Sequence, residues 1–359
     1  RQRQMCIRDR LEACKPSVKY MQRDSMIEAR NLSIGYRLGR RGRKVLYTEL
    51  SFGLRRGELT CLLGPNGAGK STLLRTISGS QRPLGGSILL EGRELSVCTE
   101  QEISRKIGLV LTDKTMTGGL TVFDLVSLGR HPHTGFFGRL KEKDYTIIRD
   151  SLDAVGIGAK ADHYVAELSD GERQKVMIAR ALAQECPVLL LDEPTAFLDV
   201  VSRIEIMSLL HKLAAEQGKT ILLSTHDLEQ ALLLSDRLWL LSRTEGLQCG
   251  ITEELVFRGT MDHFFARNEI VFDKTSGSFR PLPSQGIQVQ VEASGELLFW
   301  VNNILMRNGF CCATEGKDVA FLLQAAAPDD FILRFPDGRI DKFTSFAELD
   351  TYLKNVYKL

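Results

Sequence analysis

The chain has 359 residues, of which 43% are hydrophobic and 26% are charged, as is typical of a globular protein large enough for two domains. Its 47 Lys and Arg residues nearly balance its 45 Asp and Glu residues, which excludes a strong overall attraction to nucleic acid or to an anionic membrane. The eight cysteines have no metal-ligand spacing, and no apolar run approaches the roughly 18 residues of a membrane-spanning helix.

Residues 1–25 are basic and irregular and have neither the apolar stretch nor the small-residue cleavage site of a secretory signal. Because no regular pattern precedes Ile27, we interpret this segment as a disordered or artefactual extension. The sequence predicts that the natural chain starts at Met21 or Met26.

Residues 26–255 form the larger predicted domain, in which short apolar segments alternate with helical ones. This alternation is typical of an α/β fold with a largely parallel sheet. Glu58–Leu63 and Val188–Leu191 are predicted buried strands, and Lys70–Ser78 is a predicted helix. Residues 121–184 are mostly helical by pattern and predict a helical subdomain inserted between the two halves of the sheet.

Residues 256–286 are predicted to be a linker region, because Gly, Ser and Pro accumulate near its end and the hydrophobic periodicity stops. Residues 287–359 follow as a second, small α+β domain. Its clearest signals are a hairpin around Pro336-Asp337-Gly338 and a last helix that begins with a capping box at 345–348.

A glycine-rich segment follows the strand at 58–63 and has the spacing G-x-x-x-x-G-K-[ST]. Its glycines let backbone N–H groups turn toward phosphate oxygens, and the N-terminus of the following helix adds its dipole. Lys70 is expected to reach the β- and γ-phosphates, and the Ser71 hydroxyl to ligate magnesium. The predicted nucleotide-binding residues are Gly64, Pro65, Asn66, Gly67, Ala68, Gly69, Lys70, Ser71 and Thr72.

Two acidic residues, Asp192 and Glu193, come directly after the buried strand at 188–191. Parallel strands deliver functional groups at their carboxyl ends. Asp192 is therefore expected to hold magnesium, directly or through water, and Glu193 to orient and deprotonate the attacking water. The alternative is that the two acids merely begin a loop, which the preceding phosphate loop disfavours.

A third motif, LSDGE at 168–172, stands before a predicted helix. Ser169 and Gly171 would give that helix a phosphate-binding N-terminus of its own. One nucleotide does not need two such sites, so the sequence predicts that this one closes over the nucleotide of a second copy. A cap that serves only its own helix is the alternative.

The order of the phosphate loop, LSDGE, LLLDEP at 189–194 and Ser-Thr-His at 224–226 resembles the ATP-binding cassette (ABC) ATPases, across about residues 26–255. The resemblance implies an α/β P-loop NTPase fold with a RecA-like core, an antiparallel β subdomain and a helical subdomain, followed here by the small α+β module. It also implies ATP hydrolysis with Mg²⁺ and a homodimer of cassettes.

Further residues gain roles from the resemblance alone. Tyr36 falls where the family stacks an aromatic ring on adenine, with a core tyrosine as the alternative. Asp199 falls in the D-loop at the dimer interface, and His226 matches the histidine that senses the γ-phosphate. Thr112 stands at the position of the Q-loop glutamine, a magnesium ligand that threonine is too short to replace. Either Asp113 or a water substitutes, or the coupling between transport and hydrolysis is tuned differently.

The stretch TVFDLVSLGRHPH at 121–133 is similar to a segment of the ATPases that drive import of iron-siderophore complexes, haem and cobalamin. In that family the permease docks between the Q-loop and the signature, so residues 113–140 are the predicted docking face. The resemblance implies multi-helix permease subunits as partners and a substrate-binding protein that acts indirectly. It places the protein peripherally on the cytoplasmic face of the inner membrane.

Two other functions stay open on the sequence. An exporter ATPase would have the same motor, and a soluble ABC protein acting on ribosomes or DNA would have the same cassette. The single cassette, the balanced charge and the lack of a heptad run argue for transport, and no nucleic-acid partner is expected. For the C-terminal module, regulation, dimerisation and protection of the permease interface are all open.

Overall fold

The computed structural model describes residues 25–38, 42–111, 119–135, 137–196, 198–265, 270–274, 276–281, 286–313 and 319–356. These residues divide into two compact units. The first contains the described residues up to Phe265 and those between 274 and 278, and the second contains the rest. The predictions for Thr112, Asp113 and the start of the chain lie outside the described residues.

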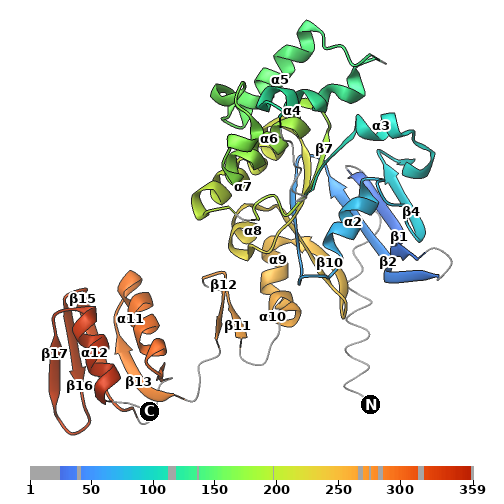
Figure 1. The fold of residues 1–359 in the computed structure, drawn as a ribbon. Coiled ribbons are helices and arrows are strands. Elements are labelled where there is room, and N and C mark those ends of the chain that lie inside the picture. The colour runs from blue at the N-terminus through green and yellow to red at the C-terminus, as the bar shows by residue number, and fades with distance from the viewer. Residues whose placement is uncertain are drawn as a thin grey trace, which may run out of the picture. The chain divides into compact units, whose positions relative to one another are not determined.

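The first unit begins with an antiparallel sheet of four strands, in the order β2-β1-β4-β5 (Figure 1). In β2, the buried residues Leu50, Phe52 and Leu54 alternate with more exposed ones, as expected of a sheet with one solvated face. The strands span Ser25–Arg37 (β1), Arg43–Arg55 (β2), Gly85–Leu90 (β4) and Arg93–Glu94 (β5).

A second sheet of six strands has the order β10-β9-β3-β8-β7-β6. The strands from β9 to β6 are parallel, and β10 is antiparallel to β9. Strands β3, β7 and β8 are buried along their whole length, which explains their continuous apolar sequences. The strands span Leu59–Leu63 (β3), Ile107–Val110 (β6), Val188–Asp192 (β7), Thr220–Ser224 (β8), Arg237–Ser242 (β9) and Gly246–Ile251 (β10).

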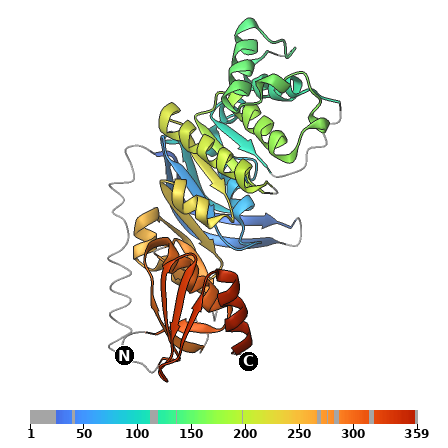
Figure 2. The same ribbon diagram turned by 90° about the vertical axis from the view of Figure 1, so that its left-hand side faces the viewer.

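Helix α2 (Lys70–Ile77) packs between the two sheets and contacts both β1 and β7 (Figures 1 and 2). Its apolar side chains join one hydrophobic core with residues of both sheets, including Phe52 and Trp239, whose ring centroids are 4.6 Å apart. Helices α7 (Val200–Gln217) and α8 (Leu228–Leu234) pack against the parallel sheet as well, α7 on β3 and β8, and α8 on β3.

A helical subdomain is inserted between β6 and β7, as predicted. Helices α4 and α5 pack on α6, which also contacts β6. The α-helices of this subdomain span Val122–Ser127 (α4), Glu142–Ala154 (α5) and Asp170–Ala183 (α6), and its 3-10 helices span Leu128–His133 (η3), Gly158–Lys160 (η4) and Val165–Glu167 (η5). The 3-10 helix Leu95–Val97 (η2) and helix Glu100–Ser104 (α3) lie before β6 in the chain.

The segment 256–286, predicted to be a linker, contains regular structure. Helices α9 (Thr252–Phe257) and α10 (Thr260–Phe264) belong to the first unit, and a hairpin follows them, formed by β11 (Ile270–Asp273) and β12 (Ser278–Pro281). The helices are shorter than the window of roughly 11 to 18 residues over which helical periodicity is counted, so the sequence pattern missed them. The domain boundaries stay a prediction.

The second unit has the predicted α+β character. Its five-stranded sheet has the order β14-β13-β15-β16-β17, and β16 and β17 form the hairpin expected around Pro336-Asp337-Gly338. A separate core contains the fully buried Phe321 and Phe331. The elements span Ile287–Glu292 (β13), Gly295–Arg307 (α11), Phe310–Cys312 (β14), Leu322–Ala327 (β15), Asp330–Arg334 (β16), Ile340–Phe343 (β17) and Phe346–Val356 (α12).

Candidate nucleotide-binding site

The glycine-rich loop at 64–69 joins the end of β3 to the first residue of α2, which is the context that a phosphate loop requires. Gly67 and Gly69 have φ angles of 73° and 106°, in the left-handed region that favours glycine. Gly64 is required by space instead, because a Cβ there would lie 2.4 Å from the carbonyl oxygen of Leu241 in β9. The fold therefore explains each of the three glycines in the motif.

We expect Gly64→Ala to lower the free energy of unfolding by about 2 kcal/mol, because the added methyl group would meet backbone atoms that cannot move aside. Equilibrium unfolding in urea measures this change. Gly135→Ala is a matched control, since a Cβ at Gly135 would meet no atom within 4 Å. Equal unfolding free energies for the two variants would contradict the proposed close approach to β9.

The three predicted catalytic residues, Lys70, Glu193 and His226, come together at the carboxyl ends of neighbouring parallel strands. Lys70 Nζ donates a hydrogen bond to the carbonyl oxygen of Gly64 at 2.9 Å and lies 3.6 Å from Glu193 Oε1. His226 Nδ1 lies 3.8 Å from the other oxygen of the same carboxylate. The Lys70 side chain is buried, whereas that of His226 is 59% exposed. Glu193 thus stands between a buried cation and an imidazole that borders solvent.

Ser224, the last residue of β8, holds the acidic pair that ends β7. Its hydroxyl donates a hydrogen bond to Asp192 Oδ1 at 2.7 Å and accepts one from the Glu193 N–H at 2.9 Å. Glu193 has a φ of 47°, so the chain turns sharply there in a backbone region that is uncommon for residues other than glycine. Sequence reasoning missed this role of Ser224, although its place at the end of a parallel strand, two residues before His226, was an available signal.

Tyr36 in β1 lies beside the phosphate loop. Its hydroxyl forms a 2.5 Å hydrogen bond with Thr72 Oγ1 in the first turn of α2. The residue is 45% exposed, which contradicts the alternative of a core tyrosine. Stacking of its ring on adenine stays a prediction.

Ser169 and Asp199 cap neighbouring helices. Ser169 Oγ accepts a hydrogen bond from the Glu172 N–H at 3.3 Å, and the Glu172 carboxylate accepts one from the Ser169 N–H at 3.1 Å. Asp199 accepts hydrogen bonds from the N–H and the hydroxyl of Ser202, which lower the pKa of its carboxyl group. Gly171 lies against α7, since a Cβ there would be 3.2 Å from Ser202 Oγ. The two helix N-termini therefore meet. The contacts of Ser169 also fit the alternative of a cap that serves only its own helix.

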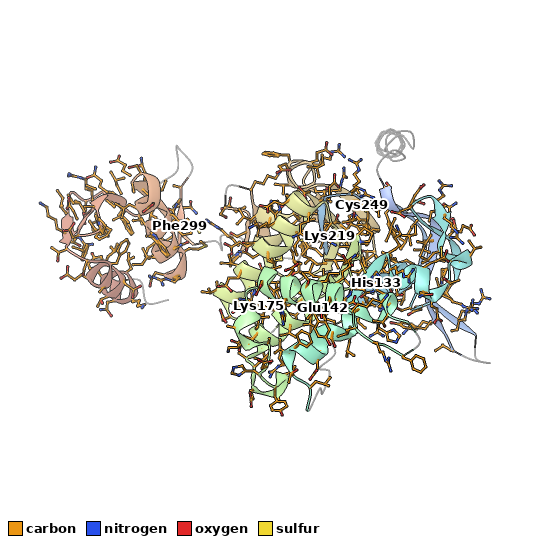
Figure 3. The ribbon with its side chains drawn as sticks, turned by 90° about the horizontal axis from the view of Figure 1, so that it is seen from above. His133, Glu142, Lys175, Lys219, Cys249 and Phe299 are labelled. Carbon is orange, nitrogen blue, oxygen red and sulfur yellow. The ribbon has the colours of Figure 1, made fainter. Side chains whose placement is uncertain are left out.

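The stretch at 121–133 that indicated a permease docking face has two of its residues bound to the end of α6. Arg130 Nη1 donates a hydrogen bond to the carbonyl oxygen of Ala183 at 2.6 Å. His133, labelled in Figure 3, forms a 2.9 Å hydrogen bond through Nε2 with the carbonyl oxygen of Gln184. Cations and hydrogen-bond donors at a helix C-terminus satisfy carbonyl groups that lack a partner in the helix. Arg130 and His133 thus have a structural role within the subdomain.

A glycine loop that joins a parallel strand to a helix, with its lysine beside the acidic end of another strand of the same sheet, defines a P-loop nucleoside triphosphatase. The ABC transporter family profile matches residues 47–196, and the iron ABC transporter C-terminal domain profile matches residues 286–354.

Two relatives match more than two thirds of this chain. An uncharacterized ABC transporter ATP-binding protein of Methanocaldococcus jannaschii is 40% identical over 254 residues, which are 71% of this chain and 86% of the relative. The iron(3+)-hydroxamate import ATP-binding protein FhuC of Bacillus subtilis is 37% identical over 248 residues, which are 69% of this chain and 90% of the relative. The chain belongs to the family of ABC transporter ATP-binding proteins.

Among solved structures, the dimeric post-hydrolysis state of an ATP-binding cassette bound to ADP and phosphate matches with a TM-score of 0.56 and 28% identity. The match covers 63% of this chain and 99% of that chain. The predicted fold class is confirmed. The protein is an ABC ATPase, which binds ATP and couples its hydrolysis to transport.

Proposed function

We propose that this chain is the ATPase subunit of an importer for metal chelates or corrinoids, with iron-siderophore complexes as the first candidate, ahead of haem and cobalamin. Two independent similarities support the proposal. The chain is similar over 69% of its length to an iron(3+)-hydroxamate import ATP-binding protein, and residues 286–354 match the iron ABC transporter C-terminal domain profile.

Hydrolysis is assigned to the group formed by Lys70, Glu193 and His226. The Lys70 ammonium donates a hydrogen bond to the Gly64 carbonyl oxygen and lies beside the Glu193 carboxylate. A bound triphosphate carries more negative charge than that one carboxylate and would attract the ammonium more strongly. Movement of the ammonium toward the β- and γ-phosphates frees Glu193 to accept a proton from the attacking water. His226, on the far side of the carboxylate, is placed to hydrogen-bond to the γ-phosphate.

The oxygen groups at the end of β7 and the start of α2 fit a magnesium ion. Asp192 offers a carboxylate that is 7% exposed and that Ser224 orients by a hydrogen bond to one oxygen. Ser71 offers a hydroxyl next to Lys70. Hard oxygen ligands of this kind are those that Mg²⁺ prefers, and the bound ion would neutralise charge on the phosphates. Thr112 stays a metal-site prediction from the sequence alone, with Asp113 or a water as the group that would reach the ion.

The second helix N-terminus supports the proposed homodimer. Ser169 and Gly171 at the start of α6, with Asp199 at the start of α7, form one region that would close over the nucleotide held by a second copy. Helix N-termini stabilise phosphate charge through their N–H groups and dipole. Two copies would then sandwich two ATP molecules, and hydrolysis would separate them.

The proposed partners are permease subunits, with a substrate-binding protein that acts through them. Leu128 and Phe137 in the predicted docking region are 51% and 83% exposed, so they offer apolar surface to a permease helix. Within the part of the chain that the structure describes, no helix is both long and apolar enough to span a membrane. We place the protein peripherally on the cytoplasmic face of the inner membrane, held there by the permease.

Reconstitution tests the proposed import. The chain is purified with the permease encoded beside its gene, placed in vesicles, and supplied with radiolabelled ferric hydroxamate and the neighbouring substrate-binding protein. We expect ATP-dependent accumulation of the label, lost in Lys70→Ala, with haem and cobalamin tested as alternative cargo. ATP-driven release from preloaded vesicles would favour an exporter. An active ATPase that neither binds the permease nor moves any of the three compounds would favour a non-transport ABC protein.

A further inference from the structure

Besides Lys70, two side chains from outside the sequence motif bind carbonyl groups of the phosphate loop. The hydroxyl of Tyr47, in β2, donates a hydrogen bond to the carbonyl oxygen of Ala68 at 2.6 Å. Arg243, just after β9, donates one through Nη2 to the carbonyl oxygen of Gly67 at 3.0 Å. Tyr47 and Ala68 are both buried, at 6% and 3% exposure, so this first hydrogen bond is shielded from water.

These contacts determine where the loop's N–H groups point. In a planar trans peptide unit the C=O and the N–H point in opposite directions. When Tyr47 holds the Ala68 carbonyl, the N–H of Gly69 in the same peptide unit must therefore point away from β2. The preceding peptide unit, between Gly67 and Ala68, is held at both ends. Arg243 donates a hydrogen bond to its carbonyl oxygen, and its N–H donates one to the Pro65 carbonyl oxygen at 3.1 Å.

The ring of Tyr47 also supports the backbone of Gly69. Gly69 has a φ of 106°, and a Cβ there would lie 3.3 Å from both Tyr47 Cε2 and Leu46 Cδ1. The tyrosine thus packs behind the residue whose N–H it orients. Burial raises the pKa of the Tyr47 hydroxyl, so the group remains a donor at neutral pH.

We propose that Tyr47 is a positioning residue for the nucleotide's β-phosphate: its hydroxyl holds the Ala68 carbonyl so that the Gly69 N–H is aimed at phosphate oxygens, and Arg243 fixes the preceding peptide. The proposal rests on the assignment of residues 64–72 as the phosphate site. Tyr47 lies outside the G-x-x-x-x-G-K-[ST] motif, so sequence reasoning did not select it.

Tyr47→Phe isolates the hydroxyl, because it keeps the ring behind Gly69. We expect the affinity for ADP and for ATP to fall about tenfold, the size of one lost buried hydrogen bond of about 1.4 kcal/mol. AMP has no β-phosphate, so its affinity should stay unchanged. The KM for ATP should rise by the same factor while kcat changes less than about twofold, since Glu193 is untouched. Calorimetry for ADP and AMP, and phosphate release for ATP, supply these values.

Tyr145→Phe is the matched control, because Tyr145 is 39% exposed on α5. We expect this variant to bind ADP as tightly as the unchanged protein. An unchanged ADP affinity in Tyr47→Phe would overturn the proposal, as would an equal loss of affinity for ADP and AMP.

If Tyr47→Phe fails to fold, Arg243→Gln tests the proposal instead, because the hydrogen bond of Arg243 to the loop is exposed and its loss disturbs the fold less. We expect ADP affinity about threefold weaker in Arg243→Gln, and an unchanged value would overturn the proposal. Failure of the unchanged protein to bind ADP would instead refute the site assignment itself.

Discussion

Glu193→Gln is expected to lower the steady-state rate of ATP hydrolysis by about a thousandfold while ATP binding persists. The amide keeps the size of the side chain and its place at the end of β7, but it cannot accept the proton of the attacking water. It also removes the negative charge that lies 3.6 Å from the Lys70 ammonium, so that ammonium becomes freer to bind phosphate. Phosphate release at saturating ATP and direct binding of ATP separate the two effects.

The same variant should accumulate as an ATP-bound dimer, because hydrolysis is the step that separates the copies. Size-exclusion chromatography with ATP and magnesium tests this, with ADP in place of ATP as the comparison. Glu216→Gln makes the same chemical change on an exposed turn of α7 and should hydrolyse ATP at the normal rate. A normal rate in Glu193→Gln would show that another group accepts the proton.

Arg130→Ala should lower the free energy of unfolding by about 3 kcal/mol, although Arg130 belongs to the stretch that indicated permease docking. Its guanidinium is 3% exposed and binds Asp144 Oδ1 at 2.9 Å, Glu185 Oε2 at 2.8 Å and the Ala183 carbonyl oxygen at 2.6 Å. Alanine would leave the buried Asp144 carboxylate and the last turn of α6 without that partner. Urea unfolding measures the loss, and Arg149→Ala, exposed on α5, is the control.

The amount by which Arg130→Ala lowers the free energy of unfolding should depend on pH. Burial alone would raise the pKa of Asp144, but hydrogen bonds from the Lys141 N–H and from Arg130 together lower it. The pKa of Asp144 in the folded protein is thus below its value of about 3.9 in the unfolded chain. The ionised carboxylate therefore stabilises the fold fully above about pH 3.9. This stabilisation is lost as the pH falls through the pKa of Asp144 in the folded protein. The free energies of unfolding of Arg130→Ala and of the unchanged protein should therefore approach each other below about pH 4. Equal losses in Arg130→Ala and Arg149→Ala would contradict the structural role.

Most of the fold was predictable because its elements carry strong local signals. The buried strands read as unbroken apolar runs, and the N-terminus of α6 reads as a serine with a glutamate three residues later. The elements that sequence analysis missed, such as α10 and the three-residue strand β14, are too short to establish a period. Met261 in α10 and Phe310 in β14 are nevertheless buried, which a single apolar residue in a short segment does not reveal.

The kinds of chemical group in the proposed site can be predicted from short stretches of residues, because a phosphate loop, an acidic strand end and a helix cap each need only a few adjacent residues. Which of these groups meet is known only from the folded chain. Lys70, Glu193 and His226 follow three strands that are neighbours solely through the order of the parallel sheet. Burial of Arg130 under α6 and of Tyr47 behind the phosphate loop likewise depends on long-range packing, which no local pattern of residues encodes.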